Sequence, residues 1–361
     1  MIMNLIGFVN ALLVNIGVIA GLNDPQYKVT PVGFLNMLLE NPATTQISNL
    51  SQLQNGYDRT IKVRYLQRGL ESSVTDKDDC DTPIGAVWKE TEIGAPNYSK
   101  IGLFIPDSEF RKYQEEASKT LSVGTPAAPM MLGLYNLLLT QIQAMLQKID
   151  GNLVSAQATK FGKNIVSGNT TPVNVNFSTT ISQTDGITKI LSDFAANEMV
   201  GTPILVGNGA VNNWQLAQSM KTGIDQGGFG ASNLKYYNDF KTSTLWGANH
   251  FGVFSQGTIG LVDYNKNVGP FAGEKGGSIF FTLPIPVQLA NGTLTTFKFD
   301  AQLKYEDCPV YDDLGAKVAD RGWKLIISKY YGLFNLPNDV FATGDPLEGV
   351  NGSFHYIGAN V

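Results

Sequence analysis

The sequence predicts an α+β fold, because it combines one long helix with separate runs of strand pattern. A helix is expected over 130–160, where apolar residues recur at spacings of three and four. Strands are expected over 278–305 and 323–330, where apolar and polar residues alternate as they do in half-buried strands. Between them, residues 187–206 predict a helix followed by a short buried strand, which indicates an α/β region.

The chain carries little charge for its size. Its 361 residues include 26 Lys and Arg against 31 Asp and Glu, so charged residues make up 16% and the net charge is −5. Because an average protein has roughly a quarter of its residues charged, the surface here must be largely neutral, which favours association between copies. The acidity argues against binding nucleic acid through a basic face.

Residues 1–60 are expected to form an extended arm that holds one short helix around 34–39. The first part, 1–22, is apolar, but the first basic residue is Lys28 and several asparagines interrupt the run. A signal peptide needs a positive start and a membrane span tolerates few asparagines, so neither is favoured. We expect a soluble arm that buries its apolar side on a neighbour.

Residues 61–106 predict a long hairpin loop with basic shoulders and an acidic tip. The tip could meet opposite charge on another copy of the chain, although a merely solvated loop is an equally good interpretation. The residues expected to make contacts between subunits are Arg59, Lys62, Arg64, Tyr65, Arg68, Asp78, Asp79, Asp81 and Trp88.

No catalytic, metal or cofactor site is predicted. The two histidines, His250 and His355, are far apart in sequence and belong to no metal-ligand spacing. The two cysteines, Cys80 and Cys308, predict free thiols in a reducing cytosol, although a disulfide stays open. Phosphate-cradling and hydrolase-nucleophile motifs do not occur in the sequence.

One short motif comes near to a nucleotide-binding pattern. Gly207-Asn208-Gly209 follows the predicted buried strand, as the start of a dinucleotide fingerprint would, but the sixth position is Asn212 instead of Gly or Ala. An ordinary strand-to-helix turn explains the glycines better. An α/β enzyme with a nucleotide site over 207–213 is kept as an alternative.

The order of the predicted parts resembles the major capsid (coat) proteins of tailed bacteriophages, the family that shares the Hong Kong phage capsid fold. Residues 202–208, with 214–217 and the glycine loop 227–230, look like the strand, helix and loop of that family's axial domain. Residues 297–305 and 323–330 look like its late strands. The resemblance implies these parts: an N-terminal arm (1–60), an extended loop (61–106), a peripheral domain with the spine helix (107–170), an axial domain (171–270), and C-terminal strands (271–361) that complete both domains.

The resemblance implies a structural protein without enzymatic activity. Its copies would assemble into hexamers and pentamers of an icosahedral shell that encloses double-stranded DNA, in the virion capsid, after assembly in the cytoplasm of a host bacterium. Portal, scaffolding and decoration proteins would be its other partners, the DNA would be held non-specifically, and no membrane would be involved. Deleting 1–60 should then abolish shells and leave a soluble capsomer. A secreted surface-layer-like assembly protein stays open as a further alternative.

Overall fold

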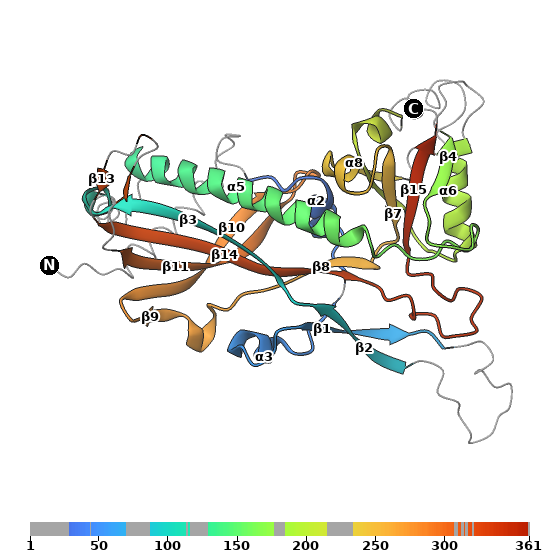
Figure 1. The fold of residues 1–361 in the computed structure, drawn as a ribbon, viewed down its shortest axis with the longest axis horizontal. Helices are drawn as coiled ribbons and strands as arrows, with labels where there is room; N and C mark the ends of the chain where they lie inside the picture. The colour runs from blue at the N-terminus through green and yellow to red at the C-terminus, as the bar shows by residue number, and fades with distance from the viewer. Residues whose placement is uncertain are drawn as a thin grey trace, which may run out of the picture. The chain divides into compact units, whose positions relative to one another are not determined.

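The computed structural model describes residues 29–43, 45–69, 87–112, 115, 129–176, 185–214, 234–306, 310–311, 314, 317–319 and 321–359. These residues form two compact units (Figure 1). Unit 1 contains the described parts of Met1–Pro31, Asn97–Lys148 and Asp263–Tyr330, and unit 2 contains those of Val32–Pro96, Ile149–Val262 and Tyr331–Val361. The division into five parts made from the sequence stays a prediction.

Unit 1 is built on a six-stranded sheet. Its strand order is β3 (Asn97–Pro106), β14 (Gly322–Asn335), β11 (Leu294–Glu306), β10 (Ser278–Gln288) and β9 (Gly273–Lys275), with β8 (Ile259–Tyr264) also paired to β14. A small separate ladder joins β12 (Val310–Tyr311) to β13 (Lys317–Ala319). The strands predicted over 278–305 and 323–330 are confirmed, and β14 continues five residues beyond the predicted end.

In the β10–β11 hairpin, the alternation of residues and the turn glycine account for how the two strands pair. The strands pair antiparallel from Ser278 opposite Lys304 to Gln288 opposite Leu294. Alternate residues of β10 are buried, as the period of two requires. In the connecting turn Gly292 has a φ of +84°, a left-handed conformation that glycine adopts without steric cost.

The long helix is confirmed as α5 (Pro129–Gln157). Its buried residues recur at the predicted spacing, with Leu138, Ile142 and Leu146 in unit 1 and Ile149 and Leu153 in unit 2. Glutamine and asparagine interrupt its apolar pattern. In the described part of the chain, no helix has both the length and the apolar character that crossing a membrane demands.

Unit 2 contains a mixed five-stranded sheet, as expected for an α/β region. The strand order is β4 (Val173–Asn176), β15 (Ser353–Ala359), β7 (His250–Phe254), β5 (Ile204–Gly207) and β6 (Lys235–Asn238). Strand β5 is buried along its whole length, and α6 (Asp185–Ala196) precedes it as predicted. Strand β15 lies inside the sheet between β4 and β7, although no strand was predicted in the C-terminal tail.

The short helix of the N-terminal segment is confirmed as α2 (Gly33–Glu40), but its packing differs from the prediction. Phe34, Leu35, Met37 and Leu38 are almost completely buried inside unit 2 of the same chain. A second helix, α3 (Leu50–Asn55), follows it. Helix α2 is therefore buried within unit 2, and we expect deletion of 1–60 to destabilise that unit. The apolar run 1–22 lies outside the described residues.

Candidate intersubunit surface on the β1–β2 hairpin

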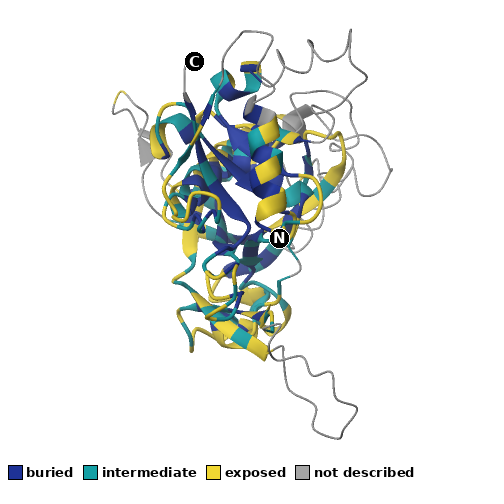
Figure 2. Ribbon diagram, turned by 90° about the vertical axis from the view of Figure 1, so that its right-hand side faces the viewer, coloured by how far each residue is buried: buried dark blue, intermediate teal, exposed yellow. Residues whose placement is uncertain are grey.

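The predicted hairpin is present and belongs to unit 2. Strands β1 (Ile61–Gln67) and β2 (Val87–Gly94) pair antiparallel, with Leu66 opposite Trp88 and Arg64 opposite Glu90. On β1 the buried and accessible residues alternate, so that one side faces the unit and the other faces away from it. No residue of β2 is fully buried, and Figure 2 shows the exposed residues of this region in yellow.

The inner side of the hairpin is fixed to the segment that follows β14. The Tyr65 hydroxyl donates a hydrogen bond to Asp339 Oδ1 at 2.7 Å, and Lys89 Nζ lies 3.2 Å from Asp339 Oδ2. Burial raises the pKa of Tyr65, and the Asp339 carboxylate raises it further. Burial would raise the pKa of Asp339, but the bonds from Tyr65 and Lys89 outweigh it and lower that pKa. Tyr65 is therefore a core residue, and we leave it out of the contact surface proposed below.

The outer side carries an exposed apolar pair, which we call the hairpin tip patch: Leu66 and Trp88, which lie opposite each other on the two strands. Trp88 is 70% exposed and Leu66 is 48% exposed. Large apolar side chains that gather on a strand pair without cover are typical of protein interfaces. The sequence analysis named only Trp88. The alternation of β1 could have identified Leu66, because it falls on an outward position like Arg64.

The predicted basic shoulder is largely neutralised within the chain. Arg64 faces Glu90 across the strand pair, Lys62 Nζ lies 3.5 Å from Glu92, and Arg68 Nη1 lies 3.0 Å from Glu198. These pairs are largely exposed, and exposed pairs contribute little to stability, so they remain available to exchange partners. Arg59 is exposed at the start of the hairpin. Asp78, Asp79 and Asp81, like Cys80 and Cys308, lie outside the described residues.

The glycine turn after β5 has the geometry of a structural turn. A Cβ on Gly207 would lie 2.9 Å from Phe251 Cβ, so glycine is needed for close packing against β7. Asn208 Oδ1 accepts hydrogen bonds from the amides of Ala210 and Val211 at 3.1 and 3.3 Å. Because those amides are the donors that a bound phosphate would use, the side chain of Asn208 already fills that role.

The two histidines, distant in sequence, meet in unit 2. His250 on β7 and His355 on β15 are joined by a 2.9 Å contact between Nδ1 and Nε2. His355 also stacks on Phe161, with 4.3 Å between the ring centres. Burial, and then the neighbouring His250, lower the pKa of His355 to about 4. Nowhere among the described residues do three potential ligands gather around a metal position, so the pair is a packed aromatic contact.

The His355 pKa predicts a loss of stability in acid. A histidine whose pKa falls on folding favours the unfolded state as pH drops from about 6.5 towards 4. We expect the free energy of unfolding of wild type, relative to His355→Phe, to fall by about 2 kcal/mol between pH 7 and pH 5. Urea titrations of both proteins at each pH would measure this. A difference that does not change with pH would contradict the assignment.

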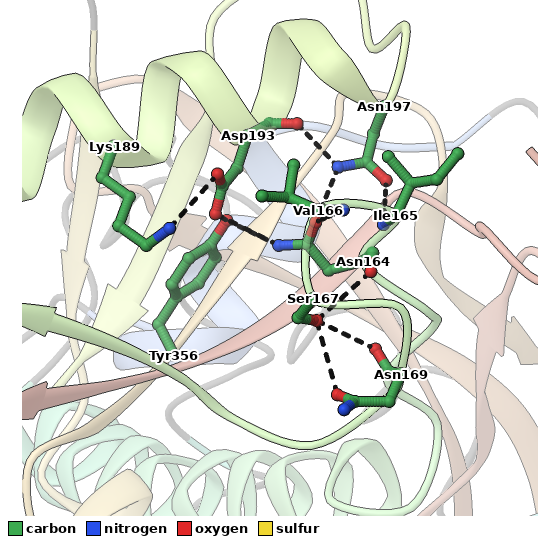
Figure 3. A network of polar contacts seen from close by, with 9 residues as sticks. All are labelled: Asn164, Ile165, Val166, Ser167, Asn169, Lys189, Asp193, Asn197 and Tyr356. Carbon is green, nitrogen blue, oxygen red and sulfur yellow. Dashed lines mark hydrogen bonds and ion pairs between the residues drawn. The ribbon is translucent and has the colours of Figure 1, made fainter.

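A buried polar network fixes α6 to β15 (Figure 3). Asp193 Oδ2 accepts hydrogen bonds from Asn164 Nδ2 and from the Tyr356 hydroxyl, both at 3.2 Å, and Lys189 lies 3.5 Å from Oδ1. Asn197 donates to Asn164 Oδ1 at 3.0 Å. Burial and the Asp193 carboxylate raise the pKa of Tyr356. The side chains satisfy one another, as buried polar groups in a structural role do.

A cavity of about 220 Å³ lies beside β2 in unit 2, and its lining includes Lys160 and three asparagines. Asn351 donates to Asn338 at 2.9 Å, and Asn335 donates to the Lys160 carbonyl at 2.5 Å. Lys160 Nζ donates to the Leu333 carbonyl at 3.0 Å. These lining groups already form hydrogen bonds with other side chains and with the backbone, as polar groups in a structural role do.

Comparison with solved structures bears on the fold. The chain is similar to a chain of the cyanophage A-1(L) capsid asymmetric unit, with 10% identity, a TM-score of 0.51, and coverage of 92% of this chain and 94% of that one. A chain of Gordonia phage Cozz matches with a TM-score of 0.44 and 10% identity, and the match covers 94% of this chain and 91% of that one. A chain of Mycobacterium phage Bobi matches with a TM-score of 0.43 and 10% identity, over 95% of this chain and 94% of that one. No protein-family model matches the sequence, and no curated protein does. The cyanophage likeness confirms the predicted fold: this chain has the capsid fold.

Proposed function

We propose that the chain is a structural protein, the major capsid subunit of a bacteriophage, and that it has no enzymatic activity. The observation that carries the proposal is the fold, which is similar over nearly the whole chain to a subunit of the cyanophage A-1(L) capsid. Fold alone does not define function, so the argument also needs features of the surface.

Two such features support assembly between copies. The hairpin tip patch exposes Leu66 and Trp88, which lie opposite each other on the outer side of the β1–β2 pair. In addition, only 16% of all residues are charged, so copies repel one another weakly. A protein that must meet identical neighbours on several sides needs broad neutral faces and a few apolar anchors.

The patch is proposed to pack on a second copy, together with the half-buried Lys62 and the exposed Arg64 and Arg68. The pairs of Lys62 with Glu92 and of Arg68 with Glu198 could then exchange for pairs between subunits. Arg59, Asp78, Asp79 and Asp81 complete the proposed contact set.

The copies are proposed to form hexamers and pentamers of an icosahedral shell around double-stranded DNA. The net charge of −5 fits a wall that confines DNA without gripping it, because strong non-specific binding requires lysine and arginine clusters. The proposed location is the virion capsid, assembled in the cytoplasm of the host bacterium. Portal, scaffolding and decoration proteins are the further partners proposed, with no membrane involved.

The test is electron microscopy of the full-length chain after expression alone in a bacterial cytoplasm, combined with sedimentation velocity. Closed shells, or rings of five or six subunits, are the expected result. A monodisperse monomer, both alone and when produced with the neighbouring phage proteins, would contradict the proposal. A cleaved N-terminus or an attached glycan on native protein would favour the secreted assembly protein instead.

A further inference from the structure

Helix α2 begins without a cap from its own sequence. Val32, at the N-cap position, makes no side-chain hydrogen bond to the helix, and the first turn contains no acidic residue. Instead, the Phe34 amide donates to Asp239 Oδ2 at 3.0 Å, and the Leu35 amide donates to Asp150 Oδ1 at 2.9 Å. Two carboxylates from distant parts of unit 2 therefore bind the free amides at the helix start.

The fit at this contact is close. Gly33 has a φ of +48°, and a Cβ there would lie 2.3 Å from Asp239 Cγ, so only glycine lets the helix start reach the carboxylate. Phe34 and Leu35 are 0% exposed, and the Phe34 ring meets Trp246 edge-on at 6.0 Å. The carboxylates and the apolar packing together hold α2 in unit 2.

The charges at the contact do not balance. Lys241 Nζ donates to Asp150 Oδ2 at 2.9 Å, and the Lys241 amide donates to Asp239 Oδ1 at 2.9 Å. The ammonium group thus bonds to Asp150, while a backbone amide bonds to Asp239; the two carboxylates are 0% and 2% exposed. Burial of a charge is costly, and a second like charge nearby adds to that cost.

Further titratable and charged groups lie around α2. Tyr236 on β6 interacts with Asp239, and burial raises its pKa. At the opposite end of the helix, the Tyr237 hydroxyl donates to Glu40 at 2.6 Å, and Lys235 Nζ donates to Asn41 at 3.2 Å. Burial, and then the negative Asp239, raise the pKa of Asp150 to about 7, although the hydrogen bonds from Leu35 and Lys241 act to lower it.

We propose that Asp150, beside Asp239, is a proton-dependent latch, which holds α2 in unit 2 while Asp150 is protonated and loosens when Asp150 is ionised. The proton removes the negative charge of Asp150 next to Asp239 and leaves an oxygen atom free to accept the Leu35 amide. When the helix opens, Asp150 enters water and its pKa returns towards that of an ordinary carboxyl, so opening releases the proton. The latch belongs to a single chain, so its test is independent of shell formation.

Hydrogen exchange of the full-length protein, followed by mass spectrometry of peptides covering 33–41, tests the latch between pH 5 and pH 8.5. After correction for the intrinsic exchange rate, protection of α2 should fall close to tenfold for each pH unit up to about pH 7, and then level off. A peptide covering β5 should not show this slope, because only α2 opens. A flat profile for α2, or the same slope in β5, would overturn the proposal.

Three variants separate the latch from general loss of stability. Asp150→Asn should give a flat α2 profile, because the group that takes up the proton is gone. Lys241→Met should move the levelling-off to higher pH, since the ammonium group favours the ionised pair. Asp193→Asn is the matched control, since Asp193 is also a buried carboxylate of unit 2 but belongs to the α6–β15 network. Asp193→Asn should keep the pH dependence of α2 protection that wild type shows. If that pH dependence disappears in Asp193→Asn, the latch is also contradicted.

Discussion

Trp88→Glu is expected to abolish shell formation while the chain stays folded. The Trp88 side chain is 70% exposed in the single chain, so its replacement removes little packing within unit 2. In the proposed assembly the same side chain would be buried against a second copy. Truncating a buried aromatic anchor costs about 2 kcal/mol or more per contact, which is roughly a thirtyfold loss of affinity. Because each subunit repeats the contact, the loss is multiplied over the shell.

Sedimentation velocity and electron microscopy measure the outcome, and urea unfolding checks the fold. The free energy of unfolding should stay within about 0.5 kcal/mol of wild type, as for most exposed substitutions. Trp88→Phe should keep shells, because it preserves an aromatic anchor. Val200→Glu places the same new charge at another exposed apolar residue, 85% exposed and outside the hairpin, and should also keep shells. Shells of Trp88→Glu at wild-type yield would show that the hairpin tip patch is not a contact.

The elements that could be predicted are those in which the periodic pattern of apolar residues continues over many consecutive positions. Helix α5 and strands β10 and β11 each repeat their period over ten or more residues, which leaves little room for another interpretation. Strand β15 was missed because it is a short run among glycines in the tail, and its place between β4 and β7 depends on pairing with distant strands. Local pattern does not carry that information.

Polar pairs inside unit 2 could not be predicted from local sequence pattern either. His250 and His355 are separated by 105 residues, and only the pairing of β7 with β15 brings their rings together. Asp150 and Lys241 are 91 residues apart, yet they share a contact at α2. The sequence predicted a short helix at α2 within an extended arm, but the surface that buries its apolar residues is set by tertiary structure.

The hairpin was predicted in outline, and its chemistry only in part. Trp88 was identified from residue type alone. The position of Arg64 opposite Glu90 depends on the strand register, which the sequence does not fix when the two arms are joined by a long loop. Tyr65 was named as a contact from its residue type, but its alternation with Arg64 places it on the inward side with Ile61 and Val63, where Asp339 accepts its hydrogen bond.

Unit 1 contains a buried lysine whose removal is expected to be among the most destabilising substitutions in the chain. The Lys329 side chain on β14 is 1% exposed and forms an ion pair with Asp263. Its Nζ also donates to Asn265 Oδ1 at 2.9 Å and to the Lys298 carbonyl at 2.6 Å. The Phe297 ring lies 4.8 Å below it. All three donors of the ammonium group are therefore used, which is what makes burial of the charge tolerable.

Lys329→Met keeps most of the apolar stem and removes the charge. Because three acceptors then lose their donor, we expect the free energy of unfolding to fall by about 3 kcal/mol in urea titrations at pH 8. The matched control is Arg111→Met, which breaks the exposed 3.0 Å pair with Asp107, also in unit 1, and should cost less than about 1 kcal/mol.

The loss caused by Lys329→Met should also depend on pH. Burial raises the pKa of Asp300, and Lys329 acts in the opposite direction, so removing the lysine raises that pKa further. A carboxyl whose pKa is raised on folding favours the folded state at low pH and loses that advantage as pH rises through its folded value. The difference between wild type and Lys329→Met should therefore be smaller at pH 5 than at pH 8. An equal difference at both values would mean that lost packing, and not the uncompensated carboxylates, causes the destabilisation.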